Sequence, residues 1–159
     1  MPELILPTAT VRDSFLSGER EGCAEDGISP SWLESAEADF ASFAATRRAT
    51  QQRWGVPYTE LWYVSGHQYY GTVIIRHHLT PGLRRDGGHI GYHVVPGHRR
   101  LGHATAMLAA ACALCRRRGM TELLITCDEG NIASRKVIEA NSGWMHDLAG
   151  RVCHYWIKL

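Results

Sequence analysis

The chain has 159 residues, of which 45% are hydrophobic and 21% are charged, and its formal net charge is +1. This composition is typical of one globular domain with a full core, and so small a net charge does not indicate nucleic-acid or membrane binding. No apolar run approaches the roughly twenty residues of a membrane helix, and the first residues lack the pattern of a secretory signal. The five cysteines are an odd number in a domain that needs no disulfides. We therefore expect a reduced, cytoplasmic chain.

The first half of the chain is predicted to form a strand, two helices and two strands, at residues 4–6, 11–24, 32–44, 60–64 and 69–76. Gly18 or Gly22 is expected to break the first helix. Ser29 and Pro30 suit the start of the second helix, because serine caps well and proline fits the first helical position. Residues 79–88 contain glycines and a proline and are predicted to be a loop.

The second half alternates strands and helices, predicted at residues 89–95, 101–118, 123–127, 132–141, 144–148 and 152–158. The helix at 101–118 carries one apolar stripe and ends in three arginines before Gly119. The last two strands are predicted to form a hairpin around Gly150.

The stretch from Arg99 to Ala104 joins a predicted strand to a predicted helix and has the features of an anion site. The first N–H groups of a helix lack intrahelical partners and carry a partial positive charge, so a pyrophosphate fits there. Arginine suits phosphate by charge and fork geometry, and Gly102 lets the backbone approach closely. We predict a phosphorylated cofactor held by Arg99, Arg100, Leu101, Gly102, His103 and Ala104. Taken alone, the two arginines would be ordinary surface charge.

Two sequence motifs carry a family resemblance. Val94-x-Pro96-x-x-Arg99-x-x-Gly102-x-Ala104 is similar to the acetyl-CoA signature of the GNAT superfamily of N-acetyltransferases, and Asn131-Ile132-Ala133-Ser134 is similar to its second motif. Further stretches resemble a bacterial group of that superfamily, at residues 75–79, 87–92, 124–128 and 155–157. The resemblance implies an α/β (α+β) GNAT fold, with a mixed central sheet of about seven strands and about four flanking helices, in one domain over residues 1–159.

The resemblance also implies acetyl-CoA, or another acyl-CoA, as co-substrate. Its pyrophosphate would lie on the N–H groups of Leu101 to Ala104, and its pantetheine arm would pair with the main chain of Val94 and Val95. Asn131 and Ser134, three residues apart on one helical face, would contact the same arm. Asn131 is equally suited to cap its helix, and the two roles are compatible.

The acyl-transfer step needs a base for the attacking amine. By the resemblance, His89 occupies the position where relatives often carry glutamate and is our first choice, while His93 and Tyr92 on the same strand are further catalytic candidates. For each histidine, a packed strand residue is an equally strong interpretation. Ile138 stands where relatives have a tyrosine that protonates the thiolate, so the acid is left to Tyr92, Tyr155 or water.

The acceptor is expected to contact Arg76 and His77, which end a strand and could hold a carboxylate or phosphate. A solvated strand end is an equal alternative. The aromatic residues Trp32, Trp54, Tyr58 and Trp62 could line the pocket, although most are expected in the core.

The leading hypothesis is an N-acyltransferase that transfers an acetyl or other acyl group from acyl-CoA to the amine of a small molecule by direct attack, without a metal. Two alternatives are an acyltransferase with another activated donor such as aminoacyl-tRNA, and a non-catalytic CoA-binding module. We expect no membrane partner and no nucleic acid except tRNA as donor. The oligomeric state is left open, with a homodimer as a candidate because this fold often dimerises.

Overall fold

The computed structural model describes residues 1–159 and contains two antiparallel sheets. The first sheet has the order β1-β3-β4-β5, with β2 paired to β3, and consists of β1 (Glu3–Ile5), β2 (Gln51–Arg53), β3 (Val56–Ser65), β4 (Gln68–Arg76) and β5 (Ile90–Val94). The second has the order β6-β8-β7 and consists of β6 (Glu122–Asp128), β7 (Trp144–Ala149) and β8 (Val152–Lys158).

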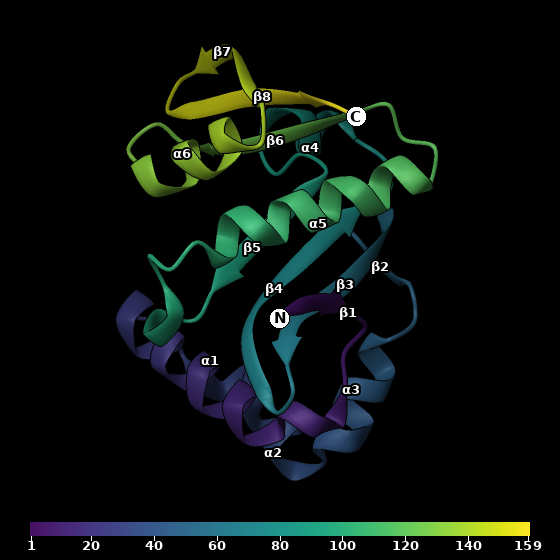
Figure 1. Ribbon diagram of the computed structural model, residues 1–159, viewed down its shortest axis with the longest axis vertical. Helices are drawn as coiled ribbons and strands as arrows, with labels where there is room; N and C mark the ends of the chain where they lie inside the picture. The colour runs from purple at the N-terminus through teal and green to yellow at the C-terminus, as the bar shows by residue number, and fades with distance from the viewer.

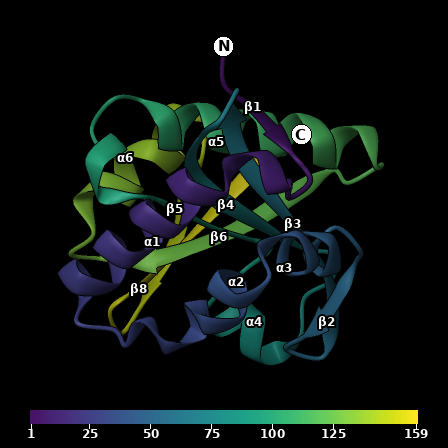
Figure 2. The same cartoon turned by 90° about the horizontal axis from the view of Figure 1, so that it is seen from below.

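Six α-helices cover the sheets: α1 (Arg12–Asp26), α2 (Glu34–Ala38), α3 (Phe40–Arg47), α4 (Pro81–Arg85), α5 (His103–Arg117) and α6 (Ile132–Ala140). Three short 3-10 helices are η1 (Ala9–Val11), η2 (Pro30–Leu33) and η3 (Pro96–His98). Helices α1 to α3 lie below the first sheet in Figure 1 and nearest the viewer in Figure 2, while α5 crosses between the two sheets (Figure 1). None of the helices is long and apolar enough to cross a bilayer.

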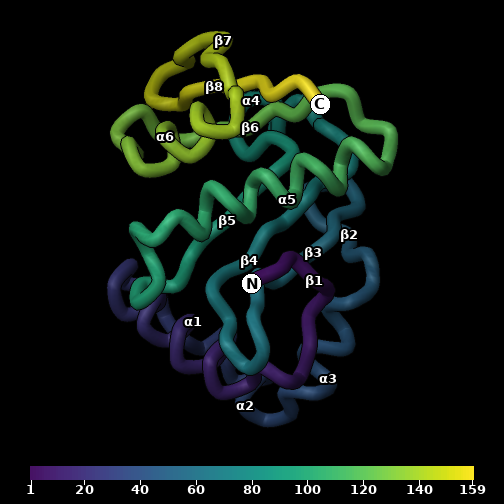
Figure 3. The backbone as a smooth tube through the Cα atoms, in the orientation of Figure 1, coloured from purple at the N-terminus to yellow at the C-terminus, as the bar shows by residue number.

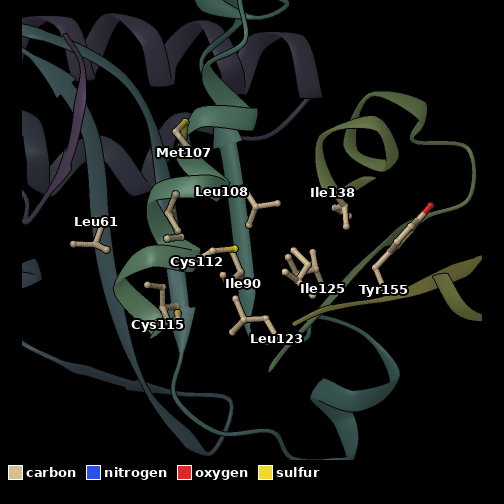
Figure 4. Packing of buried hydrophobic residues seen from close by; sticks show 14 of the residues in the cluster. Leu61, Ile90, Met107, Leu108, Cys112, Cys115, Leu123, Ile125, Ile138 and Tyr155 are labelled. Atoms are coloured by element: carbon tan, nitrogen blue, oxygen red, sulfur yellow. The ribbon is translucent and has the colours of Figure 1, made fainter. Parts of the chain in front are cut away.

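The alternating side chains of the strands divide the core in two. Trp62 and Val64 of β3 face α1 to α3 and join an aromatic cluster, whereas Leu61 and Tyr63 face α5. On the α5 side, Leu108 and its neighbours pack between both sheets (Figure 4). The position of α5 therefore fixes one sheet relative to the other.

The two sheets meet at the start of β5. Gly88 and Ile125 form an isolated bridge, and the His89 N–H donates to the Leu124 carbonyl at 2.7 Å. Further along, β5 and β6 are not paired. At the far end of β5, η3 leads the chain past α1, although the two are distant in sequence (Figure 3). This arrangement leaves an opening between β5, α5 and α6.

The predicted mixed α and β fold is confirmed, but the eight strands form two antiparallel sheets in place of the one mixed central sheet predicted, because only the bridge of Gly88 with Ile125 pairs one sheet with the other. Three local differences concern the helices. Helix α1 continues through both glycines, and Gly18 is needed for close packing, because a Cβ there would lie 2.9 Å from Val95 Cγ1. The predicted second helix is divided at Asp39, which has an extended φ of −154° and caps α3 by accepting from the Ser42 N–H. The loop at 79–88 contains α4, capped by Thr80.

Candidate active site

The turn before α5 has the backbone form of an anion cradle. Gly102 is the N-cap of α5 with φ 86°, and no side chain caps the helix. Arg100 also has a positive φ, 62°. The N–H groups from Arg100 to Thr105 have no acceptor within the protein. The turn therefore presents several unpaired donors at the positive end of a helix dipole, which is the arrangement that binds phosphate.

A cavity of about 790 Å³ opens in front of this turn. It is lined by the predicted residues Tyr92, His93, Val94, Arg99, Arg100, Gly102, His103, Ala104, Asn131 and Ser134. It is also lined by residues that the sequence reasoning missed: His98, Thr105, Ile132, Ala133, Lys136 and Val137. Lys136 and Val137 lie one helical turn after Ile132 and Ala133, so helical spacing from the second motif could have found them.

The backbone of β5 is exposed along one edge of the cavity. The Val95 N–H donates to Tyr70 O at 2.9 Å, and the Arg76 N–H donates to His89 O at 2.6 Å. Because antiparallel pairing alternates, the backbone groups of Tyr92 and Val94 point away from β4. The Val94 N–H is therefore placed to donate to an extended amide chain, although the Val94 carbonyl already accepts from Arg99 Nε; Val95 uses its N–H within the sheet.

The two arginines of the cradle differ in their contacts. The Arg99 Nε donates to Val94 O at 2.8 Å, and its Nη1 contacts Glu25 Oε2 at 3.0 Å. The Arg100 side chain has no hydrogen bond or ion pair in the protein, and Leu101 is exposed beside it. Arg100 is thus the free cation at the turn, while Arg99 braces the end of β5 against α1.

The second motif has a structural use as well. Asn131 caps α6, since its Oδ1 accepts from the Ser134 N–H at 3.1 Å. The Ser134 Oγ lies 2.7 Å from the Tyr92 hydroxyl, which joins β5 to α6 across the cavity. Ile138, one turn further along α6, is fully buried and points toward Ile125 and Tyr155 (Figure 4).

His93 forms the closest acid–base pair in this region. Its Nε2 lies 2.7 Å from Glu19 Oε1 of α1, and half of its side-chain surface is exposed, against 8% for Glu19. Burial alone lowers the pKa of His93, but the hydrogen bond and charge of Glu19 outweigh it, so the pKa is raised. Burial raises the pKa of Glu19, yet the contacts with His93 and Tyr69 give a net lowering. Both groups are therefore stabilised in their charged forms.

Glu19 is itself held by groups behind it. The Tyr69 hydroxyl, which is fully buried, donates to Glu19 Oε1 at 2.5 Å and lies 2.6 Å from the Thr72 hydroxyl. Since Glu19 accepts at one oxygen from both Tyr69 and His93, its carboxylate is fixed and orients the imidazole. The Nδ1 of His93 has no partner in the protein.

Two smaller cavities meet the large one at His93. A cavity of about 220 Å³ is lined by Glu19, His93, Tyr92, Trp32 and the Arg47–Glu60 ion pair, among others. A second, of about 280 Å³, also includes Glu19, Trp32 and His93. His93 thus borders the large cavity on one side and both small ones on the other. Of the predicted aromatic lining, Trp32 lies here, whereas Trp62 is in the core.

Leu101 and Val95 do not line the large cavity, and three predicted catalytic or acceptor-binding residues lie elsewhere. His89 is buried at the start of β5, where its Nδ1 accepts from the Leu124 N–H at 2.9 Å. The Arg76 Nη1 donates to the carbonyls of Gly87 and Gly88, and the guanidinium lies over Trp54. His77 bonds Thr59. The structure does not bring these residues to the large cavity; their local contacts join loops and strands.

Solved structures with the same fold include proteins that bind coenzyme A. Microcin C7 self-immunity acetyltransferase MccE, in complex with acetyl-CoA and AMP, has a TM-score of 0.70 at 12% identity, covering 98% of this chain and 91% of that one. RimL, a ribosomal L7/L12 alpha-N-protein acetyltransferase in complex with coenzyme A, has a TM-score of 0.68 at 15% identity, with coverage of 99% and 94%. RimJ of Mycobacterium smegmatis, in complex with CoA-disulfide, has a TM-score of 0.67 at 19% identity. The match covers 96% of this chain and 79% of that one. These similarities show a shared GNAT fold.

The sequence itself matches the family described as acetyltransferase (GNAT) domain over residues 18–143. Comparison with curated proteins gave no match. Because the family match covers most of the chain, the protein belongs to the GNAT acetyltransferase family. The predicted fold family and the predicted acyltransferase class are both confirmed by this membership.

Proposed function

We propose that the protein transfers an acetyl group from acetyl-CoA to the amine of a small molecule. The cradle fits the donor: unpaired N–H groups from Arg100 to Thr105 suit its pyrophosphate, and Arg100 and Lys136 supply positive charge. The open edge of β5 at Val94 suits a pantetheine arm. Solved neighbours that carry coenzyme A or acetyl-CoA support the same donor.

The acceptor amine is proposed to enter through the small cavities beside Glu19 and Trp32. Both cavities share His93 with the donor cavity, together with Tyr92 in one and Arg99 in the other, so an amine entering here reaches the thioester beside this side chain. Their volumes, about 220 and 280 Å³, suit the end of a small molecule. The microcin C7 self-immunity acetyltransferase MccE, in complex with acetyl-CoA and AMP, is a neighbour with the same fold.

His93 is proposed as the general base in place of His89. Its Nε2 is held by Glu19, so in the neutral ring the proton lies on Nε2 and the lone pair lies on the free Nδ1. As the amine nitrogen forms its bond to the acetyl carbon and the carbon–sulfur bond breaks, Nδ1 takes the proton of the amine. The resulting imidazolium is stabilised by the Glu19 carboxylate.

Tyr92 is proposed to return a proton to the departing thiolate. Its hydroxyl faces the donor cavity and is fixed by Ser134, and burial raises its pKa, which keeps it protonated at neutral pH. This assignment supplies an acid where Ile138 cannot act.

The His93–Glu19 pair at the junction of the cavities carries the proposal, and it also favours an enzyme over a module that only binds coenzyme A. The test is amine-dependent release of coenzyme A from acetyl-CoA, followed by thiol detection across a panel of small amines. We expect release with at least one amine and a loss of about 10²-fold or more in His93→Gln. Release that is the same in His93→Gln and the wild type would refute His93 as the base.

A further inference from the structure

A second polar cavity, of about 330 Å³, lies at the opposite end of β5 from the donor site. It is lined by His77, His78, Leu79, Arg84, His89, Gly119, Met120, Thr121, Glu122 and Trp156. None of these residues lines the donor cavity or the cavities at His93. Four residues of strand, or about 13 Å, separate His89 from His93. This cavity is therefore a separate feature of the fold.

His89 points a defined donor into this cavity. Its Nδ1 accepts from the Leu124 N–H, so the proton of the neutral ring lies on Nε2. The residue is only 8% exposed and lines the cavity, and its one side-chain hydrogen bond is made by Nδ1, so Nε2 has no partner in the protein. A nearly buried N–H that faces an open cavity is satisfied only by what enters it.

The surroundings of His89 are cationic. Burial, followed by the charges of Arg84, His78 and Arg76, lowers the pKa of His89 to about 4, and no carboxylate acts against them. The ring is thus a neutral donor at physiological pH. The side chains of Arg84 and His78 line the cavity and have no hydrogen bond or ion pair within the protein, so both are free to contact a ligand. Glu122 is the one acidic residue of the lining.

We propose that this cavity binds a phosphoryl group, with His89 Nε2–H, the Arg84 guanidinium and the His78 imidazole as its donors. A phosphoryl group matches them because it offers several acceptor oxygens and a negative charge to a guanidinium fork. Trp156 forms an apolar wall beside them, against which the organic part of a phosphate ester would pack. The ligand is either free phosphate or a small phosphate monoester.

The test is an NMR titration that follows the His89 Nε2–H signal in protein saturated with coenzyme A, so that the donor cradle is already occupied. Inorganic phosphate and phenyl phosphate are titrated separately at constant pH and ionic strength. We expect a saturable shift of the His89 signal with at least one of them. Tighter binding of phenyl phosphate identifies an ester as the ligand class, and equal binding identifies free phosphate.

Arg84→Gln is the diagnostic variant and Arg85→Gln its matched control. Both residues are exposed in α4, but only Arg84 lines the cavity. Because Arg84→Gln loses a charged hydrogen bond, the ligand concentration at the midpoint of its titration should be about tenfold higher than in the wild type. The midpoint of Arg85→Gln should be unchanged. The absence of a saturable shift at His89 with either compound, or equal midpoints in Arg84→Gln and the wild type, would overturn the proposal.

Discussion

Replacing Glu19 by glutamine removes the negative charge beside His93 while keeping the shape of the side chain. In the wild type, Glu19 Oε1 lies 2.7 Å from His93 Nε2. A hydrogen bond to a charged group contributes about 1.5–3 kcal/mol. We take the lower end, because half of the His93 side-chain surface is exposed and solvent screens the pair. Removing this contribution disfavours the imidazolium, so the pKa of His93 should fall in Glu19→Gln.

The assay is an NMR titration of the His93 imidazole, which requires no knowledge of the acceptor. The pKa of the wild-type ring should lie above its ordinary value of 6.5, and the pKa of the Glu19→Gln ring should lie below that of the wild type. Glu21→Gln, at an exposed position of the same helix, is the control and should leave the titration unchanged. If His93 titrates identically in the wild type and Glu19→Gln, the reasoning is refuted.

The same pair links stability to pH. Because the pKa of His93 is raised in the folded state, protonation of His93 stabilises the fold. This stabilisation is fully present below pH 6.5, the pKa in the unfolded chain, and is lost as the pH rises through the folded-state pKa. The lowered pKa of Glu19 gives stability that is present above 4.5 and lost as pH falls through its folded-state pKa. The Tm difference between the wild type and Glu19→Gln should therefore be largest at about pH 5.5 and smaller at both pH extremes.

Four further variants test the cradle, the packing of α1 and the proposed acid. Gly102→Ala places a Cβ on a residue with φ 86°, which should cost about 1–2 kcal/mol and lower the Tm in thermal melts; an unchanged Tm would contradict the strain argument. Gly18→Ala brings a Cβ to 2.9 Å from Val95 and should lower the Tm. Gly22→Ala is the control, because its Cβ would lie at an ordinary contact distance of 3.7 Å from Pro96 and the change should gain up to about 1 kcal/mol of helix propensity. Equal Tm values for Gly18→Ala and Gly22→Ala would count against close packing at Gly18. Tyr92→Phe should bind coenzyme A normally in calorimetry but release it about a hundredfold more slowly during turnover, whereas full turnover would exclude Tyr92 as the acid.

The cradle could be predicted from sequence because its physics is local. A strand, a turn with Gly102 and a helix start lie within a few residues of one another, and backbone N–H groups do the binding. The capping role of Asn131, left open by the sequence, is equally local and is present in the structure. Such features depend on neighbours in the chain and not on the packing of distant elements.

The choice between His89 and His93 could not be made from sequence. The carboxylate that orients His93 lies 74 residues away in the chain, on α1. The partner of His89 is a main-chain N–H of β6, 35 residues away, supplied where the two sheets join. The two histidines are four residues apart, one just before β5 and one within it, so only the tertiary arrangement distinguishes a ring facing a cavity from a ring bracing a sheet.

The account depends above all on His93 acting upon an amine that reaches bound acetyl-CoA. Calorimetry with acetyl-CoA, combined with thiol release on the amine panel, separates donor binding from transfer in one pair of proteins. We predict that the wild type and His93→Gln bind acetyl-CoA equally, while transfer falls by about 10²-fold or more in the variant. Unchanged transfer in His93→Gln, or no binding of acetyl-CoA to the wild type, would contradict the account.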